Sequence, residues 1–197
     1  KKKLIRCNNT INFLNKLAIL KRKSVHTKII AVTGSSGKTT LKSLLGKTLT
    51  KYGKCYFSQK SYNNHIGVPL SLCNLEYDHK YGVFEIGMSN AGEIRKLSHM
   101  VKPDIGIITN IGEAHIKNFK SINGIAKAKS EIIENIKKGG SLILNKDDKY
   151  FNFLSKFARK KKINILSFGK SKQCNATLIK NKLYKNYNNL HFRVLNK

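Results

Sequence analysis

Short apolar segments of strand length alternate with helical segments along most of the chain, and this alternation restricts the possible folds more than any other feature. The segments expected as strands are 29–33, 55–58, 82–86, 105–109, 141–144, 163–168, 176–179 and 190–195. The segments expected as helices are 39–52, 92–100, 122–136 and 149–161. Strands that alternate with helices form βαβ units, in which helices cover both faces of a parallel sheet. The sequence therefore predicts an α/β fold with a mostly parallel sheet.

The segment AVTGSSGKTT, residues 31–40, joins the first of these strands to the first helix. Gly34 and Gly37 permit backbone conformations that a Cβ atom disfavours, so that successive N–H groups and the positive end of the helix face an anion. Lys38 adds a cation for the outer phosphates, and Thr39 adds a hydroxyl suited to Mg²⁺. We expect a nucleotide-phosphate site of the P-loop type, formed by Gly34, Ser35, Ser36, Gly37, Lys38, Thr39 and Thr40.

Val32 stands where the strict P-loop pattern requires its first glycine, so only the shorter pattern G-x-x-G-K-T-T is present. The alternative is an ordinary strand-to-helix turn with a surface lysine. The order of strand, glycines, Lys-Thr pair and helix favours the phosphate site. Because ligands of parallel sheets bind at the carboxyl ends of the strands, we expect Glu85, Asn110 and Asn145 to lie on the same rim.

The chain is strongly basic, with 39 Lys and Arg against 10 Asp and Glu and a net charge of +29. This charge attracts polyanions, but no helix-turn-helix, zinc-finger or aromatic RNA-binding pattern accompanies it, so we expect only nonspecific nucleic-acid binding. The four cysteines form no C-x-x-C pair, and no apolar run approaches the roughly 20 residues of a membrane span. These features predict a cytoplasmic protein without membrane insertion.

Five further motifs follow the phosphate loop: SYNNHIGVPLSL (61–72), FEIGMSNAGEI (84–94), PDIGIITNIGEAHI (103–116), AKAKSEI (126–132) and LNKDD (144–148). In this order they resemble the central ATP-binding domain of the Mur ligases, over about residues 28–169. The N-N-x-I-G-V-P and E-x-G-x-x-x-x-G-E-I patterns are most similar to members that join D-alanyl-D-alanine to UDP-N-acetylmuramoyl tripeptide. The resemblance implies that residues 1–27 are a linker or the tail of a missing uridine-nucleotide domain. Residues 28–197 are then an incomplete central domain, truncated at its C-terminal end, without the C-terminal domain.

The resemblance also implies an activity. Family members transfer the γ-phosphate of ATP to a substrate carboxylate, and an amine then displaces phosphate from the acyl phosphate. The alternatives are another Mur ligase, or a folylpolyglutamate synthase, which shares this fold and chemistry. A P-loop kinase, which would use only the first step, and a noncatalytic basic module that binds nucleotide or nucleic acid are further alternatives. We expect a monomer that does not complete ligation alone.

The resemblance assigns metal and catalytic roles to four side chains besides that of Thr39, which would bind the first Mg²⁺. Lys38 would offset charge during transfer, Glu85 would bind Mg²⁺, and His115 would lie at a second metal. Lys129 would carry an N-carboxylate (carbamate) that turns a cation into an anionic ligand. The alternatives are a Glu85 carboxylate paired with a lysine, a polar loop histidine and a solvated helix lysine.

Asparagines and aspartates complete the expected site. Asn63 and Asn64 match a pair that lines the phosphate and substrate side, although two asparagines also favour a turn. Asn145, Asp147 and Asp148 would either approach the nucleotide or cap the helix that follows, because Asp is common at helix N-termini.

Overall fold

Every strand expected from the sequence forms in the computed structural model, which describes residues 4–114 and 116–195. Within these ranges eight strands make one sheet in the order β2-β3-β1-β4-β5-β6-β7-β8. The neighbours from β2 to β7 pair in parallel, and β7 and β8 form an antiparallel hairpin. The strands are β1 (Lys28–Thr33), β2 (Cys55–Phe57), β3 (Tyr81–Glu85), β4 (Ile105–Ile108), β5 (Ser141–Asn145), β6 (Asn164–Gly169), β7 (Ala176–Leu183) and β8 (Asn188–Val194).

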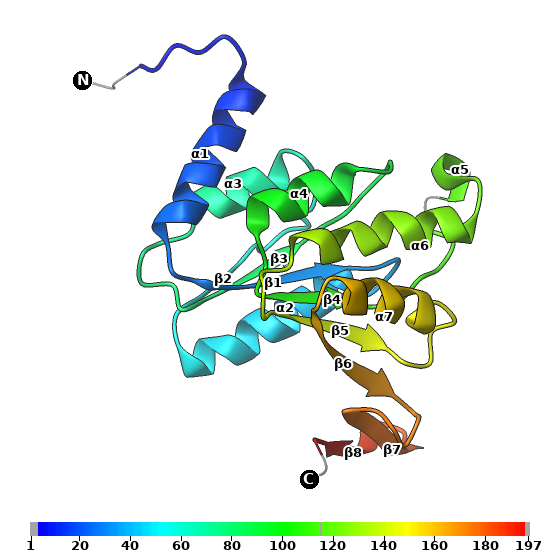
Figure 1. Ribbon diagram of the computed structural model, residues 1–197. Helices are drawn as coiled ribbons and strands as arrows, with labels where there is room; N and C mark the ends of the chain where they lie inside the picture. The colour runs from blue at the N-terminus through cyan, green and yellow to red at the C-terminus, as the bar shows by residue number, and fades with distance from the viewer. Residues whose placement is uncertain (1–3, 115, 196–197) are drawn as a thin grey trace.

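Helices cover both faces of the sheet, as predicted, but unevenly. Helices α3, α4, α6 and α7 lie on one face with α1 beside α3 and α4, and α2 packs on the other face against β1, β2 and β3 (Figure 1). The helices are α1 (Thr10–Ser24), α2 (Lys38–Leu49), α3 (Gly67–Cys73), α4 (Glu93–Val101), α5 (Ile116–Phe119), α6 (Ile122–Ser130) and α7 (Phe151–Lys160), with 3₁₀ turns η1 (Thr50–Tyr52) and η2 (Glu131–Asn135).

The packing of strand β1 explains why its sequence is apolar at successive positions. Ile29 and Ala31 belong to the larger core beneath α3, α4 and α6, whereas Ile30 and Val32 belong to a smaller core beneath α2. A central parallel strand buries both of its faces, so the usual alternation with polar residues disappears. Burial on both sides fixes the strand that carries the phosphate loop.

The structure departs from the expected helices in two places. No helix was expected over 67–73, and this segment forms α3. Pro69 is tolerated in a first turn, and five of the seven residues of α3 are buried. The helix expected over 122–136 changes to a 3₁₀ turn at Glu131, where the Glu131 carboxylate accepts hydrogen bonds from the backbone N–H groups of Gly92 and Arg95.

The N-terminal helix packs against other helices, whereas the C-terminal hairpin continues the sheet at its edge. Helix α1 packs against α3 and α4, and the buried Arg22 guanidinium donates to the carbonyl groups of Val101 and Lys102 at 2.7 and 3.1 Å. The β7–β8 hairpin extends away from the helical layers (Figure 1), and its apolar side chains are largely exposed.

None of the helices in the described ranges has the length and apolar character that crossing a membrane requires.

Candidate functional site

The phosphate loop joins β1 to α2 and is held against the loop that follows β4. The Ser35 and Ser36 backbone N–H groups donate to the main-chain and side-chain oxygens of Asn110, each at 3.0 Å. A Cβ atom on Gly34 would lie 1.8 Å from Oγ1 of Thr109, and Gly34 has a φ of +149°. The backbone conformation and the close approach both require glycine at position 34.

Asn110 changes which donors of the loop can face an anion. Since Ser35 and Ser36 already donate to Asn110, the donors that remain for the expected cradle are the N–H groups of Gly37 and of the first turn of α2. The first N–H groups of a helix have no partner within it, and they carry the positive end of its dipole. Gly37, in the left-handed region with a φ of 77°, is the N-cap of this helix, so Lys38, Thr39 and Thr40 occupy its first turn. Asn110 was predicted only as a rim residue.

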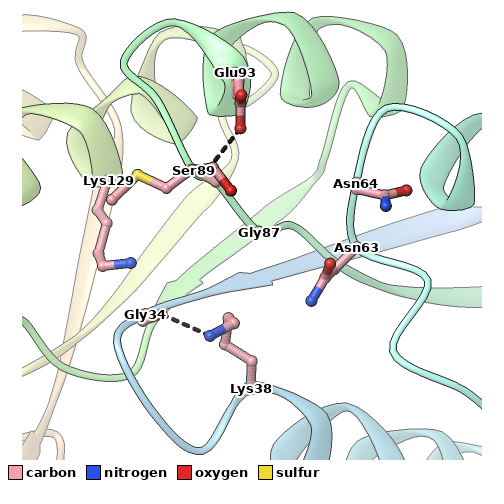
Figure 2. A pocket seen from close by; sticks show the side chains of 9 residues that line it. Gly34, Lys38, Asn63, Asn64, Gly87, Ser89, Glu93 and Lys129 are labelled. Carbon is pink, nitrogen blue, oxygen red and sulfur yellow. Dashed lines mark hydrogen bonds between the residues drawn. The ribbon is translucent and has the colours of Figure 1, made fainter. Parts of the chain in front are cut away.

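Lys38 and Lys129 face one cavity of about 150 Å³ at the rim of the sheet (Figure 2). The Lys38 ammonium donates to the Gly34 carbonyl at 2.9 Å. The lining residues are Gly34, Lys38, Asn63, Asn64, Gly87, Met88, Ser89, Glu93 and Lys129. They come from the phosphate loop, the β2–α3 loop, the β3–α4 segment and α6, so the topology brings together side chains that lie far apart in sequence.

Glu85, at the end of β3, lies on the same rim and is only 2% exposed. Its Oε2 accepts a hydrogen bond from the Thr39 hydroxyl, and its Oε1 accepts one from the Asn63 amide, both at 2.8 Å. The Lys42 ammonium lies 3.8 Å from Oε2. The carboxylate therefore contacts both a hydroxyl that suits a hard cation and a buried lysine. A carboxylate and a hydroxyl oxygen are ligands that fit Mg²⁺.

Lys42 is a site residue that the sequence prediction missed. Its side chain is completely buried, and its ammonium donates to the Lys60 carbonyl at 2.8 Å and to the Ser58 hydroxyl at 3.2 Å. Burial lowers the pKa of Lys42, and the nearby Glu85 carboxylate acts in the opposite direction. The available signal was its spacing, because residues four apart share a helix face and Lys42 follows Lys38 by four positions.

Lys129 is buried on α6, with 2% of its side chain exposed, whereas Lys127 on the same helix is exposed. Burial, together with the positive charge of Lys38, lowers the pKa of Lys129 from 10.5 to about 7. A large fraction of this amine is consequently neutral near pH 7. The prediction that Lys129 differs from a solvated helix lysine is consistent with this burial.

The remaining predicted residues are Asn64, the LNKDD residues Asn145, Asp147 and Asp148, and His115. Asn64 lines the cavity, but its side-chain oxygen accepts hydrogen bonds from the Ile66 and Gly67 N–H groups in the turn before α3, which is the turn-forming alternative. Asp148 accepts hydrogen bonds from the Ile111 and Tyr150 N–H groups at 2.7 and 2.8 Å. His115 lies outside the described residues, so its metal role stays a prediction.

Asn145 and Asp147 also bind the backbone around them. The Asp147 N–H donates to the Asn145 side chain at 3.0 Å, and the Asp147 carboxylate accepts a hydrogen bond from the Lys170 N–H at 2.8 Å. Together with the contacts of Asp148, these bonds connect the LNKDD motif to the backbone of neighbouring loops, no side chain caps α7, and an approach of the motif to the nucleotide stays a prediction.

Comparison with known proteins places this arrangement in a family. The Mur ligase middle domain matches residues 32–197. A UDP-N-acetylmuramoyl-tripeptide--D-alanyl-D-alanine ligase of Rickettsia prowazekii is 37% identical over 198 residues, which is all of this chain and 44% of that protein.

Solved structures agree with the sequence match. MurF from Acinetobacter baumannii has a TM-score of 0.89 and 32% identity, covering 98% of this chain and 43% of that one. MurF ligase from Thermotoga maritima in complex with ADP has a TM-score of 0.87 and 27% identity, covering 100% of this chain and 46% of that one. The chain thus spans less than half the length of each of these relatives. Since the family match includes well over half of the chain, the chain belongs to the Mur ligase family, with the sequence and fold of its middle domain.

Proposed function

We propose that this chain is the ATP-binding part of a carboxylate–amine ligase that joins D-alanyl-D-alanine to UDP-N-acetylmuramoyl tripeptide in peptidoglycan precursor synthesis. The observation that supports this most is the convergence of Lys38, Lys129 and the Thr39–Glu85 pair at one rim of the sheet. The relatives carry this activity in their names, and one of them is complexed with ADP. ATP and a uridine nucleotide as substrates suit the cytoplasm, and the motifs suit a monomer with no dedicated nucleic-acid role.

The chemistry follows from charge neutralisation and positioning. The first turn of α2 and Lys38 bind the β- and γ-phosphates, and Lys38 offsets the charge that develops during transfer. An oxygen of the substrate carboxylate attacks the γ-phosphorus, and the bond to the bridging oxygen of ADP breaks. The amine then attacks the acyl carbon, phosphate leaves, and the amine nitrogen loses a proton.

Thr39 and Glu85 would hold Mg²⁺, which supplies charge stabilisation for the transferred phosphoryl group. Lys129 would complete this site as a carbamate. Its neutral amine attacks the carbon of CO₂ and releases a proton to solvent, which converts a repelling cation into an anionic oxygen ligand. A pKa of about 7 supports this step, because only the neutral amine reacts. His115 is proposed for a second metal on the resemblance alone.

Titration calorimetry with Mg²⁺–ATP tests the nucleotide site directly. We expect the chain to bind Mg²⁺–ATP and the Lys38→Ala variant to lose at least tenfold in affinity, while the exposed Lys51→Ala on η1 is unchanged. Equal binding by all three proteins, or none by the unmodified chain, would contradict the proposal.

Assays with both substrates separate the ligase from its alternatives. In a longer protein that carries this domain, phosphate release must depend on an added amine, whereas a kinase releases a stable phosphorylated product without one. We expect no ligation product from the 197-residue chain alone, and measurable product would refute that expectation. Nucleic-acid binding that persists at high salt and is displaced by Mg²⁺–ATP would favour the basic module.

A further inference from the structure

Lys42 is the most deeply buried charged side chain near the site, and none of the roles proposed above uses it. Its side chain is 0% exposed. A buried ammonium is costly unless oxygen atoms surround it. Here the oxygens come from Ser58 and Lys60 in the loop after β2, at 3.2 and 2.8 Å, and from Glu85 at 3.8 Å. The ammonium therefore lies between this loop and the carboxylate proposed to receive the metal.

Different residues orient the Glu85 carboxylate and compensate its charge. Thr39 and Asn63 each donate to one carboxylate oxygen at 2.8 Å, and such short directional bonds fix the orientation of the group. Lys42, at 3.8 Å, is beyond hydrogen-bond length but close enough for a strong Coulombic interaction in a buried site. Neutral donors thus orient the carboxylate, and Lys42 supplies the opposite charge.

We infer that Lys42 is the resident counter-cation of Glu85 and makes divalent-cation binding conditional on the nucleotide. Without nucleotide, the Glu85 charge is already compensated, and the ammonium groups of Lys38 and Lys42 repel a free divalent cation. A bound triphosphate brings several negative charges to the same rim, and the balance then favours the metal. Lys42 is in this sense a positioning residue that acts through Glu85, and the inference rests on the nucleotide site proposed above.

The inference predicts the order in which ligands bind. Lys38 and Lys42 are two cations beside the one buried carboxylate of Glu85, so this part of the rim has net positive charge, and the polyanion binds first or enters together with its metal. Removing the charge of Lys42, while Thr39 and Asn63 still orient Glu85, leaves an uncompensated buried carboxylate. Such a carboxylate attracts a divalent cation even when no nucleotide is present.

Mn²⁺ titrations followed by electron paramagnetic resonance test this order, because free and bound Mn²⁺ give different signals. The probe is Mn²⁺ alone or Mn²⁺ with β,γ-methylene-ATP. For the unmodified chain we expect at least tenfold tighter Mn²⁺ binding with the nucleotide analogue than without it. Lys42→Met removes the charge and keeps an unbranched side chain, and it should bind Mn²⁺ at least tenfold tighter than the unmodified chain in the absence of nucleotide.

Two matched variants serve as controls. Lys42→Arg keeps the charge and should not gain nucleotide-free binding. Lys47→Met removes an exposed lysine from the same helix and should behave like the unmodified chain. If Lys42→Met does not fold by circular dichroism, Lys42→Gln, which keeps donors for Lys60 and Ser58, carries the same prediction.

A purely structural lysine would lower the melting temperature on substitution without raising nucleotide-free Mn²⁺ affinity, and that result overturns the inference. Equal Mn²⁺ binding by the unmodified chain with and without the analogue overturns it as well. Failure of the unmodified chain to bind the analogue at all would instead contradict the proposed nucleotide site. The two failures are therefore distinguishable.

Discussion

Replacing Lys129 with methionine should stabilise the chain at neutral pH while removing a group proposed for function. The side chain is 2% exposed, and burial, with a contribution from Lys38, lowers its pKa from 10.5 to about 7. Since one pKa unit corresponds to about 1.4 kcal/mol, holding the charged form in the native state costs about 5 kcal/mol. Methionine fills a similar volume without charge. We therefore expect Lys129→Met to raise the free energy of unfolding at pH 7 by about 3 to 5 kcal/mol.

The pH dependence gives the sharper test. Between pH 7 and 10.5 the unfolded chain keeps the proton on Lys129 and the native state does not. The stability of the unmodified chain therefore rises with pH across this window, by up to about 1.4 kcal/mol per pH unit. Below pH 7 both states hold the proton, and the cost is constant. The advantage of Lys129→Met must accordingly be largest at and below pH 7 and must shrink as pH approaches 10.

Urea unfolding followed by circular dichroism at pH 6, 7, 8 and 9 measures this difference, in buffers freed of CO₂ so that no carbamate forms. Lys127→Met is the matched control, because it lies on the same helix with an exposed side chain. We expect it to change stability by less than about 0.5 kcal/mol. An advantage of Lys129→Met that is equal at pH 6 and pH 9, or is matched by Lys127→Met, would refute the reasoning.

Three other substitutions test the packing around the site, each by urea unfolding. Gly46→Ala should destabilise by about 1 to 3 kcal/mol, against the usual sign in a helix, because its Cβ would lie 2.2 to 2.7 Å from the Phe57 ring. Arg22→Met should cost about 2 to 4 kcal/mol, because it removes the donor to the Val101 and Lys102 carbonyl groups at the C-terminal end of α4, whereas the exposed Lys23→Met should cost little. Asp148→Asn should cost about 1 to 3 kcal/mol and leave ATP affinity little changed, since both carboxylate oxygens bind backbone N–H groups; a selective loss of ATP affinity would contradict that role.

The fold was largely predictable because its signals are local. Strands such as β1 and β4 are runs of β-branched and small apolar residues bounded by loop residues, and the phosphate loop has glycines at the two positions where the backbone requires them. The convergence of Glu85 with the phosphate loop follows from topology alone, because both lie at carboxyl ends of adjacent parallel strands.

The features that escaped prediction depend on tertiary contacts. The spacing of four from Lys38 places Lys42 on the same helix face, but its burial follows from the packing of α2 against β2 and β3. Helix α3 begins with Gly-Val-Pro, and it is stabilised by the hydrogen bond from the Gly67 N–H to the Asn64 side chain and by contacts with α1 and α4. Asn110 became a central contact of the phosphate loop only because the loops after β1 and β4 meet across the parallel pair.

The net charge of +29 does not indicate which charged residues belong to the site. The burial and the contacts of individual charged side chains do. Arg22 and Glu131 are buried, but they contact the carbonyl groups at the C-terminal end and the N–H groups at the N-terminal end of α4, where the helix dipole favours a cation and an anion respectively. Their charges are therefore satisfied by the fold itself. Lys42, Glu85 and Lys129 have no such helix end as partner in the described contacts, and they lie instead at the rim beside the phosphate loop. Lys42 and Glu85 compensate one another, whereas no carboxylate pairs with Lys129 among the described residues, so this rim favours an anionic ligand such as the triphosphate proposed above.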